Sequence, residues 1–237
     1  EKVDLIIFSE LCICGYPPRD FLESTDFLKE CVIGVKKIAK HCINVSCIIG
    51  SPSINLSRKG KPLFNSALFI SNGKVLQTFN KTLLPTYDVF DENRYFEPNK
   101  NFRPISFKNH TLAITVCEDL WNVPSRLLYP ITPMDKISKF NLELIINISA
   151  SPFDVNQSKT RLRIMKENVN KYGIPIIYVN QVGAQTELIF DGGSFVLNGK
   201  GKVFHQLNYF TEDYFVFHLE ELQKEDFSPR PIKKVFG

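Results

Sequence analysis

The chain has 237 residues, of which 43% are hydrophobic and 23% are charged. This size and composition fit one globular domain at the upper end of the usual range. The 29 basic and 25 acidic residues give a formal net charge of +4 and form no basic block, which argues against nucleic acid as a partner. The longest apolar runs have about five or six residues, too few to cross a bilayer, so no membrane partner is expected.

Six cysteines and 4 histidines are the residues that bear on disulfides and metals. A domain of this length builds its core without cross-links, so free thiols are favoured over disulfides. Cys12 and Cys14 lie too close together for a zinc site, no CxxC pair exists, and the histidines are scattered. We therefore expect no metal and a reducing compartment, which indicates the cytoplasm.

Predicted strands and helices alternate along the chain. Helical spacing of apolar residues predicts helices over Asp26–His41 and Ser158–Tyr172, and the end of another helix at Asp135–Phe140. Short, β-branched apolar runs predict buried strands. In chain order these strands are Val3–Phe8, Val45–Ile49, Thr111–Val116, Leu144–Ile148 and Ile174–Val179.

Hairpins are also predicted. Ser71–Lys74 contains Asn-Gly between the apolar runs Ala67–Ile70 and Val75–Phe79, and Asn-Gly tolerates the positive φ angles of a tight turn. A second Asn-Gly turn follows the first of three short strands near the end of the chain. These are Phe195–Leu197, Val203–Gln206 and Tyr214–His218. Together the elements predict an α/β fold with mixed sheets.

Three reactive side chains each follow a predicted strand. Glu10 follows the first strand, Lys81 follows a hairpin strand, and Cys117 follows Thr111–Val116 directly. Acyl transfer from an amide needs a thiolate, a proton acceptor and positive charge beside the developing oxyanion. Cysteine, glutamate and lysine supply these roles without a histidine, and the lysine also lowers the thiol pKa.

Each of these residues has an ordinary structural interpretation when taken alone. A glutamate at a strand end is usually solvated, a lysine after a hairpin is usually a surface charge, and a cysteine after an apolar strand is often part of the core. The catalytic hypothesis rests on the three together, in this order, with the segments around them.

The order Glu10, Lys81, Cys117 resembles the carbon–nitrogen hydrolase (nitrilase) superfamily. Six segments narrow the resemblance to the glutaminase domains of glutamine-dependent NAD synthetases, and they extend over most of the chain. The segments are Leu11–Asp20, Lys81–Tyr87, Val89–Pro98, Cys117–Trp121, Asn147–Phe153 and Phe190–Ser194. The resemblance implies a four-layer α-β-β-α sandwich of the nitrilase type.

The resemblance also implies a mechanism. Cys117 would attack the side-chain amide of glutamine, Glu10 would act as general base, and Lys81 with the backbone N–H after Cys117 would stabilise the oxyanion. A thioester would form and be hydrolysed. Glu92 lies where the superfamily often has a second glutamate; its alternative role is a loop carboxylate paired with Arg94.

Substrate contacts follow from the same resemblance. It points to Tyr87 and Phe90 as walls for the aliphatic part of glutamine, Glu118 for its ammonium and Ser151 for its carboxylate. Six residues after this serine the family usually has lysine or arginine, whereas this chain has Gln157. Lys159 or Arg161 would have to replace that cation.

One further residue and one segment have expected structural roles. Asp119 is expected to be structural rather than catalytic. The Asp191-Gly192-Gly193-Ser194 segment is expected to be a structural turn, with an ammonia exit as its alternative.

The 237 residues contain no nucleotide-binding glycine loop and no Ser-Gly-Gly-x-Asp-Ser loop. We therefore expect residues 1–237 to be one glutaminase domain that lacks some N-terminal residues and a C-terminal synthetase domain. No cofactor is expected in this domain, and ATP and Mg belong to the synthetase domain. The expected partners are glutamine, that synthetase domain and further copies of the chain in a homo-oligomer.

Two alternative functions stay open at this point. One is a free-standing amidase of the same superfamily. The other is a catalytically silent scaffold that serves oligomer assembly.

Overall fold

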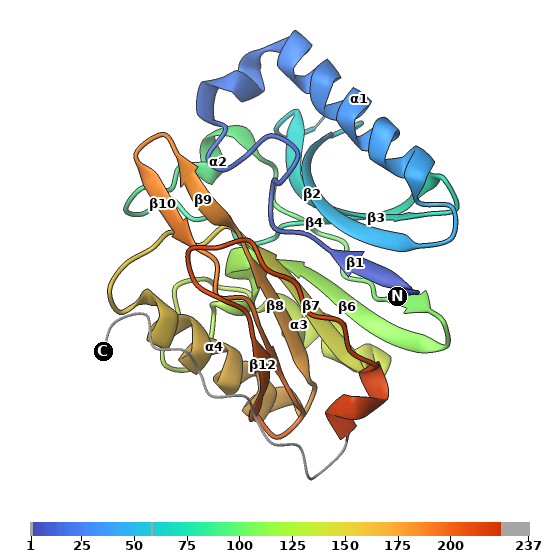
Figure 1. Cartoon of the computed structure of the whole chain (residues 1–237). Coiled ribbons are helices and arrows are strands. Elements are labelled where there is room, and N and C mark those ends of the chain that lie inside the picture. The colour runs from blue at the N-terminus through green and yellow to red at the C-terminus, as the bar shows by residue number, and fades with distance from the viewer. Residues whose placement is uncertain (1, 58, 224–237) are drawn as a thin grey trace.

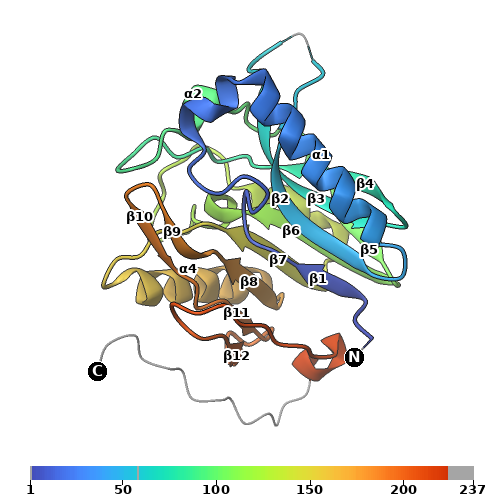
Figure 2. The same ribbon diagram turned by 45° about the horizontal axis from the view of Figure 1, so that its top comes forward.

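Two β-sheets face one another in the computed structural model, with helices on their outer faces (Figures 1 and 2). The structure describes residues 2–57 and 59–223, and the rest of the predicted domain, residues 1, 58 and 224–237, lies outside the described part. The arrangement is a four-layer α-β-β-α sandwich, so the predicted fold class is confirmed.

The first sheet has four strands in the order β1-β2-β3-β4. β1 is parallel to β2, and the other neighbours are antiparallel. Asn72 and Gly73 join β3 to β4 with φ angles of 51° and 77°, the left-handed conformation that a two-residue hairpin requires. The strands are β1 (Leu5–Ile7), β2 (Ser46–Ile54), β3 (Leu63–Ser71) and β4 (Lys74–Asn80).

The second sheet has six strands in the order β12-β11-β8-β7-β6-β5. Its central strands β6, β7 and β8 are parallel, and the outer ones are antiparallel, so the sheet is mixed. The strands are β5 (Ile105–Phe107), β6 (His110–Val116), β7 (Leu144–Ser149), β8 (Ile176–Asn180), β11 (Phe195–Leu197) and β12 (Val203–Gln206).

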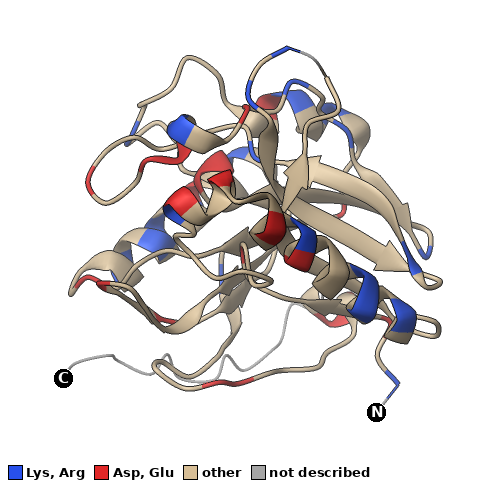
Figure 3. Cartoon of the chain, turned by 90° about the horizontal axis from the view of Figure 1, so that it is seen from above, with Lys and Arg blue, Asp and Glu red and all other residues tan. Residues whose placement is uncertain are grey.

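Helix α1 (Thr25–His41) covers the outer face of the first sheet. Ser24 caps it by accepting a hydrogen bond from the Phe27 N–H (3.3 Å). Its buried face contacts the sheet through an apolar cluster that includes Val35 and Ile49. Figure 3 shows acidic positions near the start of the helix and basic ones near its end, the order that the helix dipole favours.

Helices α3 (Pro133–Ile137) and α4 (Gln157–Tyr172) cover the outer face of the second sheet (Figure 1). Ile164 and Met165 of α4 pack against Ile145 in one apolar cluster. The remaining helices are short. They are α2 (Glu92–Tyr95) and the 3-10 helices η1 (Arg19–Glu23), η2 (Cys117–Leu120), η3 (Ser138–Phe140) and η4 (Leu219–Gln223).

The two faces of β7 belong to two different cores. Ile145 packs toward α4, whereas Ile146 and Ile148 join Ile48 and Phe69 in the layer between the sheets. Successive side chains of a strand point to opposite faces, so a strand covered on both sides is apolar throughout. This explains the apolar run Leu144–Ile146, whereas the buried polar residues Asn147 and Ser149 further along β7 hydrogen-bond to each other (2.8 Å).

The predicted strand at Tyr214–His218 is wrong. These residues form no strand, although Phe215 and Phe217 have the two-residue spacing of a strand. Phe217 packs its ring against Phe204 of β12 with centroids 5.4 Å apart, and Phe215 stacks on Phe217 at 5.7 Å. The alternation therefore serves ring packing over β12 instead of strand pairing.

A two-stranded ribbon of β9 (Val182–Gln185) and β10 (Leu188–Asp191) was not predicted. Its first strand is only four residues long, Val-Gly-Ala-Gln, and a run this short with a glycine inside it is a weak strand signal. The ribbon projects beside the strand ends (Figure 1), and the predicted turn at Asp191–Ser194 follows it directly.

The inter-sheet layer should dominate stability. Ile146→Ala removes a fully buried side chain between the sheets, so we expect it to lower the free energy of unfolding by about 2–5 kcal/mol. Ile54→Ala, in a strand but 58% exposed, should cost less than about 1 kcal/mol. Urea unfolding of both variants measures the difference, and equal losses would contradict this description of the core.

Candidate active site

Glu10 lies where the two sheets approach each other, just after β1. Its side chain is fully buried, and its backbone N–H donates to the Ser149 carbonyl of β7 (3.4 Å). Glu10 Oε2 accepts from the Ala150 N–H (2.9 Å), and Oε1 accepts from Asn65 Nδ2 (2.7 Å). The carboxylate is therefore fixed by groups from both sheets.

Lys81 follows β4 and is 1% exposed. Its Nζ donates to Glu10 Oε1 (2.8 Å) and to Glu92 Oε1 (2.5 Å). Burial alone lowers the pKa of this amine, but the two carboxylates outweigh burial and hold its pKa well above the ordinary value. Lys81 is thus a permanent positive charge at physiological pH.

Glu92 begins α2 and completes the buried cluster. It accepts hydrogen bonds from the Tyr16 hydroxyl (2.8 Å) and from Asn65 Nδ2 (3.2 Å). Burial raises its pKa to about 7, with Glu10 adding to the rise and Lys81 opposing it. The alternative pairing with Arg94 is wrong, because Arg94 lies outside the cluster and pairs with exposed carboxylates of the segment around η1.

Cys117 is the first residue of η2, directly after β6. Its φ of 42° is left-handed, an unfavourable conformation for a residue with a side chain. Burial raises the pKa of the thiol well above its ordinary value; Glu10 adds to this and Lys81 opposes it. Lys81 does lower the thiol pKa, as predicted, but burial raises it by more. The sequence does not reveal how deeply the thiol is buried, so this net rise was not predicted.

The structure brings the predicted catalytic residues together. Glu10, Lys81 and Glu92 are in direct contact, and all three act electrostatically on Cys117. All six cysteines, including Cys117, are free thiols.

Asp119 fixes the lysine segment against the cysteine segment. Its Oδ1 accepts from the N–H groups of Thr82 (2.8 Å) and Leu83 (2.9 Å), and its Oδ2 accepts from the Val116 N–H (3.1 Å). Burial raises its pKa to about 6 in spite of these hydrogen bonds. The expectation that Asp119 is structural is confirmed.

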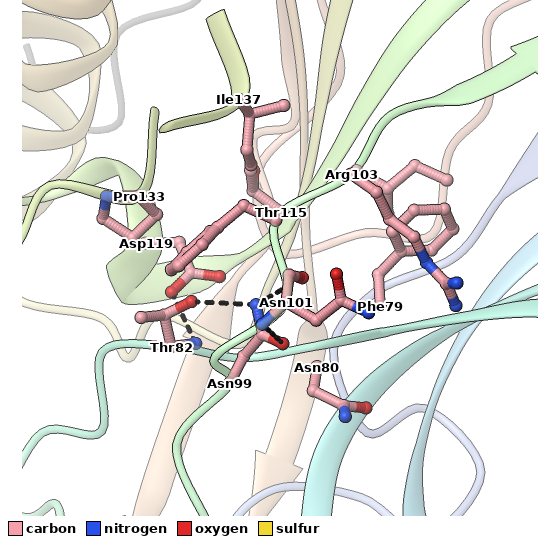
Figure 4. Close-up of a pocket in the computed structure, with 12 residues that line it drawn as sticks. Phe79, Asn80, Thr82, Asn99, Asn101, Arg103, Thr115, Asp119, Pro133 and Ile137 are labelled. Carbon is pink, nitrogen blue, oxygen red and sulfur yellow. Dashed lines mark hydrogen bonds between the residues drawn. The ribbon is translucent and has the colours of Figure 1, made fainter. Parts of the chain in front are cut away.

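A small pocket lies beside Asp119 (Figure 4). It is lined by polar side chains that include Thr82 and Asn99 and, on another side, by Pro133 and Ile137 of α3. Asn99 Nδ2 lies 3.4 Å from Thr82 Oγ1. Glu10, Lys81 and Cys117 are not among its lining residues, so this pocket lies next to Asp119 and apart from the reactive groups.

Tyr87, Phe90 and Glu118 form a second cluster beside Cys117. The Tyr87 hydroxyl donates to Glu118 Oε1 (2.7 Å), and the rings of Tyr87 and Phe90 meet edge to face with centroids 5.5 Å apart. The Tyr129 hydroxyl also donates to Glu118 Oε1 (3.1 Å). The predicted aromatic pair and carboxylate are therefore neighbours.

The residues considered for binding the substrate carboxylate do not lie together in the structure. Gln157 Nε2 lies 3.4 Å from Ser151 Oγ, so these two residues are adjacent. Lys159 is exposed on α4 and lines a surface hollow there. Arg161 is buried and donates to both carboxylate oxygens of Asp191 (2.6 Å each).

Residues that contact the site and were not predicted as site residues include Asn65, Tyr16 and Tyr129. Asn65 lies in the middle of β3, and a polar residue within a buried strand gave no functional signal. Tyr16 falls inside the Leu11–Asp20 segment, and no local sequence pattern there indicates that its side chain is buried. Their roles depend on which chain segments converge.

Metal and membrane features can be stated for the described residues only. Across residues 2–57 and 59–223, no three His, Cys, Asp or Glu side chains are grouped as metal ligands would be. In the same part of the chain, none of the helices combines the length and apolar character needed to span a bilayer.

The carbon-nitrogen hydrolase family model matches residues 1–222. With this match and the four-layer sandwich around the cluster, the chain belongs to the carbon-nitrogen hydrolase family. The family resemblance inferred from the sequence is thereby confirmed.

Within this family, the chain is similar to glutamine-dependent NAD synthetases. The chain is 37% identical to the glutamine-dependent NAD(+) synthetase of Synechocystis sp. over 217 residues, which are 89% of this chain and 39% of that protein. It superimposes on glutamine-dependent NAD+ synthetase from Acinetobacter baumannii, solved in complex with ADP, with a TM-score of 0.82 and 30% identity over 97% of this chain and 42% of that one.

The fold extends beyond these synthetases. An amidase of the nitrilase superfamily from Nesterenkonia matches with a TM-score of 0.70 and 20% identity, covering 86% of this chain and 73% of that chain, which shows the shared fold alone. The chain spans about two fifths of the length of the curated synthetases that it matches.

The pKa of Glu92 predicts a pH-dependent stability. A folded-state value of about 7, above the ordinary 4.5, means that ionised Glu92 is disfavoured in the fold. Its contribution to stability is full below about pH 4.5 and is lost as the pH rises to about 7. Glu92→Gln cannot ionise, so it should remove up to about 3 kcal/mol of this pH dependence.

Urea unfolding at about pH 5 and about pH 7.5 measures this effect. Glu30→Gln, on the exposed side of α1, is the matched control and should leave the pH dependence unchanged. If Glu92→Gln keeps the same difference between the two pH values, Glu92 does not carry the raised pKa.

Proposed function

We propose that this chain hydrolyses the side-chain amide of glutamine, with Cys117 as nucleophile, Glu10 as general base and Lys81 as the positive charge at the oxyanion. The observation that carries the proposal is the buried contact of Lys81 with Glu10 and Glu92 beside Cys117. Membership of the carbon-nitrogen hydrolase family supports it, because that chemistry breaks carbon–nitrogen bonds.

In the first half-reaction Glu10 takes the thiol proton as Cys117 Sγ attacks the amide carbon. The raised pKa of the thiol makes this base necessary, because the free thiol is protonated at neutral pH. Lys81 and the backbone N–H of Glu118 stabilise the negative charge on the oxygen. Glu10 then gives its proton to the nitrogen, ammonia leaves, and a glutamyl thioester remains on Cys117.

In the second half-reaction water attacks the thioester. Glu10 takes a proton from the water as its oxygen bonds to the acyl carbon, and then returns the proton to the sulfur as the carbon–sulfur bond breaks. Glutamate leaves and Cys117 is a thiol again. One glutamine and one water therefore give one glutamate and one ammonia.

Glu92 serves the cluster as a second partner for Lys81. With Glu92 protonated, Glu10 and Lys81 form a neutral pair; with Glu92 ionised, the buried cluster carries one extra negative charge. This makes Glu92 a positioning residue for the lysine amine, while Tyr16 and Asn65 hold the two carboxylates in place.

Substrate contacts come from the second cluster. Tyr87 and Phe90 provide apolar walls for the methylene groups, and the buried Glu118 carboxylate binds the ammonium. Ser151, with Gln157 beside it, offers a hydroxyl to the α-carboxylate of the substrate.

The full-length protein is proposed to use this ammonia. The similar proteins from Synechocystis and Acinetobacter baumannii are named glutamine-dependent NAD synthetases. We infer that a synthetase domain of the same protein binds ATP and Mg and amidates deamido-NAD, and that the enzyme is a cytoplasmic homo-oligomer. This domain itself needs no cofactor for amide hydrolysis.

Cys117→Ala in the full-length protein tests the proposal. Loss of the nucleophile should reduce glutamine-dependent ammonia release by about three orders of magnitude or more. The same variant should still use free ammonia for amidation, because that step bypasses Cys117. The control is Cys12→Ala, which removes an exposed thiol outside the cluster and should keep near-normal activity.

Three results would contradict the proposal. Intact glutamine hydrolysis in Cys117→Ala would exclude the thioester mechanism. A wild-type protein that hydrolyses simple aliphatic amides faster than glutamine would favour the amidase alternative, and one that hydrolyses neither would favour the scaffold.

A further inference from the structure

A rigid loop holds Arg126 beside the Tyr87–Glu118 cluster. Buried Asn122 organises this loop: its Nδ2 donates to the carbonyls of Tyr129 (3.0 Å) and Ile131 (3.1 Å), and its Oδ1 accepts from the N–H groups of Leu128 (3.0 Å) and Tyr129 (3.1 Å). The loop therefore has a fixed shape, and the positions of Arg126 and Tyr129 are fixed with it.

Arg126 contacts Tyr87 in two ways. Its Nη2 donates to the Tyr87 hydroxyl (2.9 Å), and its guanidinium lies over the Tyr87 ring at 5.3 Å and over the Trp121 ring at 4.9 Å. The same Tyr87 hydroxyl donates to Glu118. One hydroxyl thus separates a guanidinium from a buried carboxylate.

Neither of these charges has an ion-pair partner within residues 2–57 and 59–223. Four arginines of this part, Arg19, Arg94, Arg161 and Arg163, pair with carboxylates. Arg126 has no carboxylate within 4.0 Å, and Glu118, which is 3% exposed, has no cation within that distance. A half-buried guanidinium has five N–H donors, and in the described structure Arg126 commits one of them to Tyr87.

The other side chains considered for the carboxylate contact are paired, exposed or neutral. Arg161 is bound to Asp191, Lys159 is exposed on α4, and Gln157 is neutral. Lys81 is held by two carboxylates. Of these residues, Arg126 alone contacts the cluster that contains Glu118.

We propose that Arg126 binds the α-carboxylate of the substrate while Glu118 binds its α-ammonium. The two unpaired charges on either side of Tyr87 match the two charges of a zwitterionic amino acid, and guanidinium is the side chain best shaped for a carboxylate. The site is therefore specific for amides of α-amino acids. This inference rests on the proposed glutamine hydrolysis and names the residue that selects that substrate class.

The experiment compares two substrates in the full-length protein. Glutamine has the α-carboxylate, whereas 4-aminobutanamide keeps the ammonium and the amide but lacks it. Arg126→Gln should raise KM for glutamine about 10- to 100-fold, the value of a charge-assisted hydrogen bond, with kcat within about threefold. KM for 4-aminobutanamide should stay within about threefold of wild type. If this amide is turned over too slowly, its inhibition constant against glutamine replaces KM.

Two further variants complete the design. Arg126→Lys keeps the charge without the planar fork and should fall between wild type and Arg126→Gln. Arg103→Gln is the matched control, because Arg103 is exposed and also has no carboxylate within ion-pair distance in the described part, so its removal should change neither KM.

The outcomes separate this inference from the proposed function. An equal rise of KM for both substrates would show that Arg126 only positions Tyr87 and Glu118, which overturns the inference, and so would an unchanged KM for glutamine in Arg126→Gln. A wild-type protein that releases no ammonia from glutamine would overturn the proposed function itself, before any variant is compared.

Discussion

The buried lysine between two carboxylates is the interaction on which the site depends. Taking an ammonium out of water is costly unless close partners compensate it, and removing one member of such a group leaves an uncompensated charge. Lys81 satisfies this constraint by contacting Glu10 and Glu92, which Asn65 holds together. The same constraint keeps the amine charged, so the fold itself maintains positive charge beside Cys117.

The four-layer fold brings these groups together because they lie at strand ends. Glu10 follows β1, Lys81 follows β4 and Cys117 follows β6, so residues of both sheets meet at one edge of the sandwich. Asp119 links two of these segments through three backbone N–H groups, which couples the position of the lysine to that of the cysteine. Packing between the sheets thereby sets the geometry of the reactive groups.

The sequence predicted what lies next to strong local patterns. Glu10, Lys81 and Cys117 each follow an apolar run, and Asn72-Gly73 marks its hairpin, so these features were found. Asn65, Tyr16 and the β9–β10 ribbon were not, because their roles depend on which distant segments converge. Burial depth could not be predicted either, and burial raises the pKa of Cys117 against the effect of Lys81. The segment Tyr214–His218 was predicted as a strand, but its rings pack over β12 instead.

The central claim is that amide cleavage passes through an acyl group on Cys117. It is tested most directly by acid-quenching the full-length protein during turnover of glutamine and mapping covalent adducts by peptide mass spectrometry. We predict a glutamyl adduct on Cys117 and on none of the other five cysteines. Steady ammonia release with no adduct on Cys117, or with the adduct on another residue, would contradict this account.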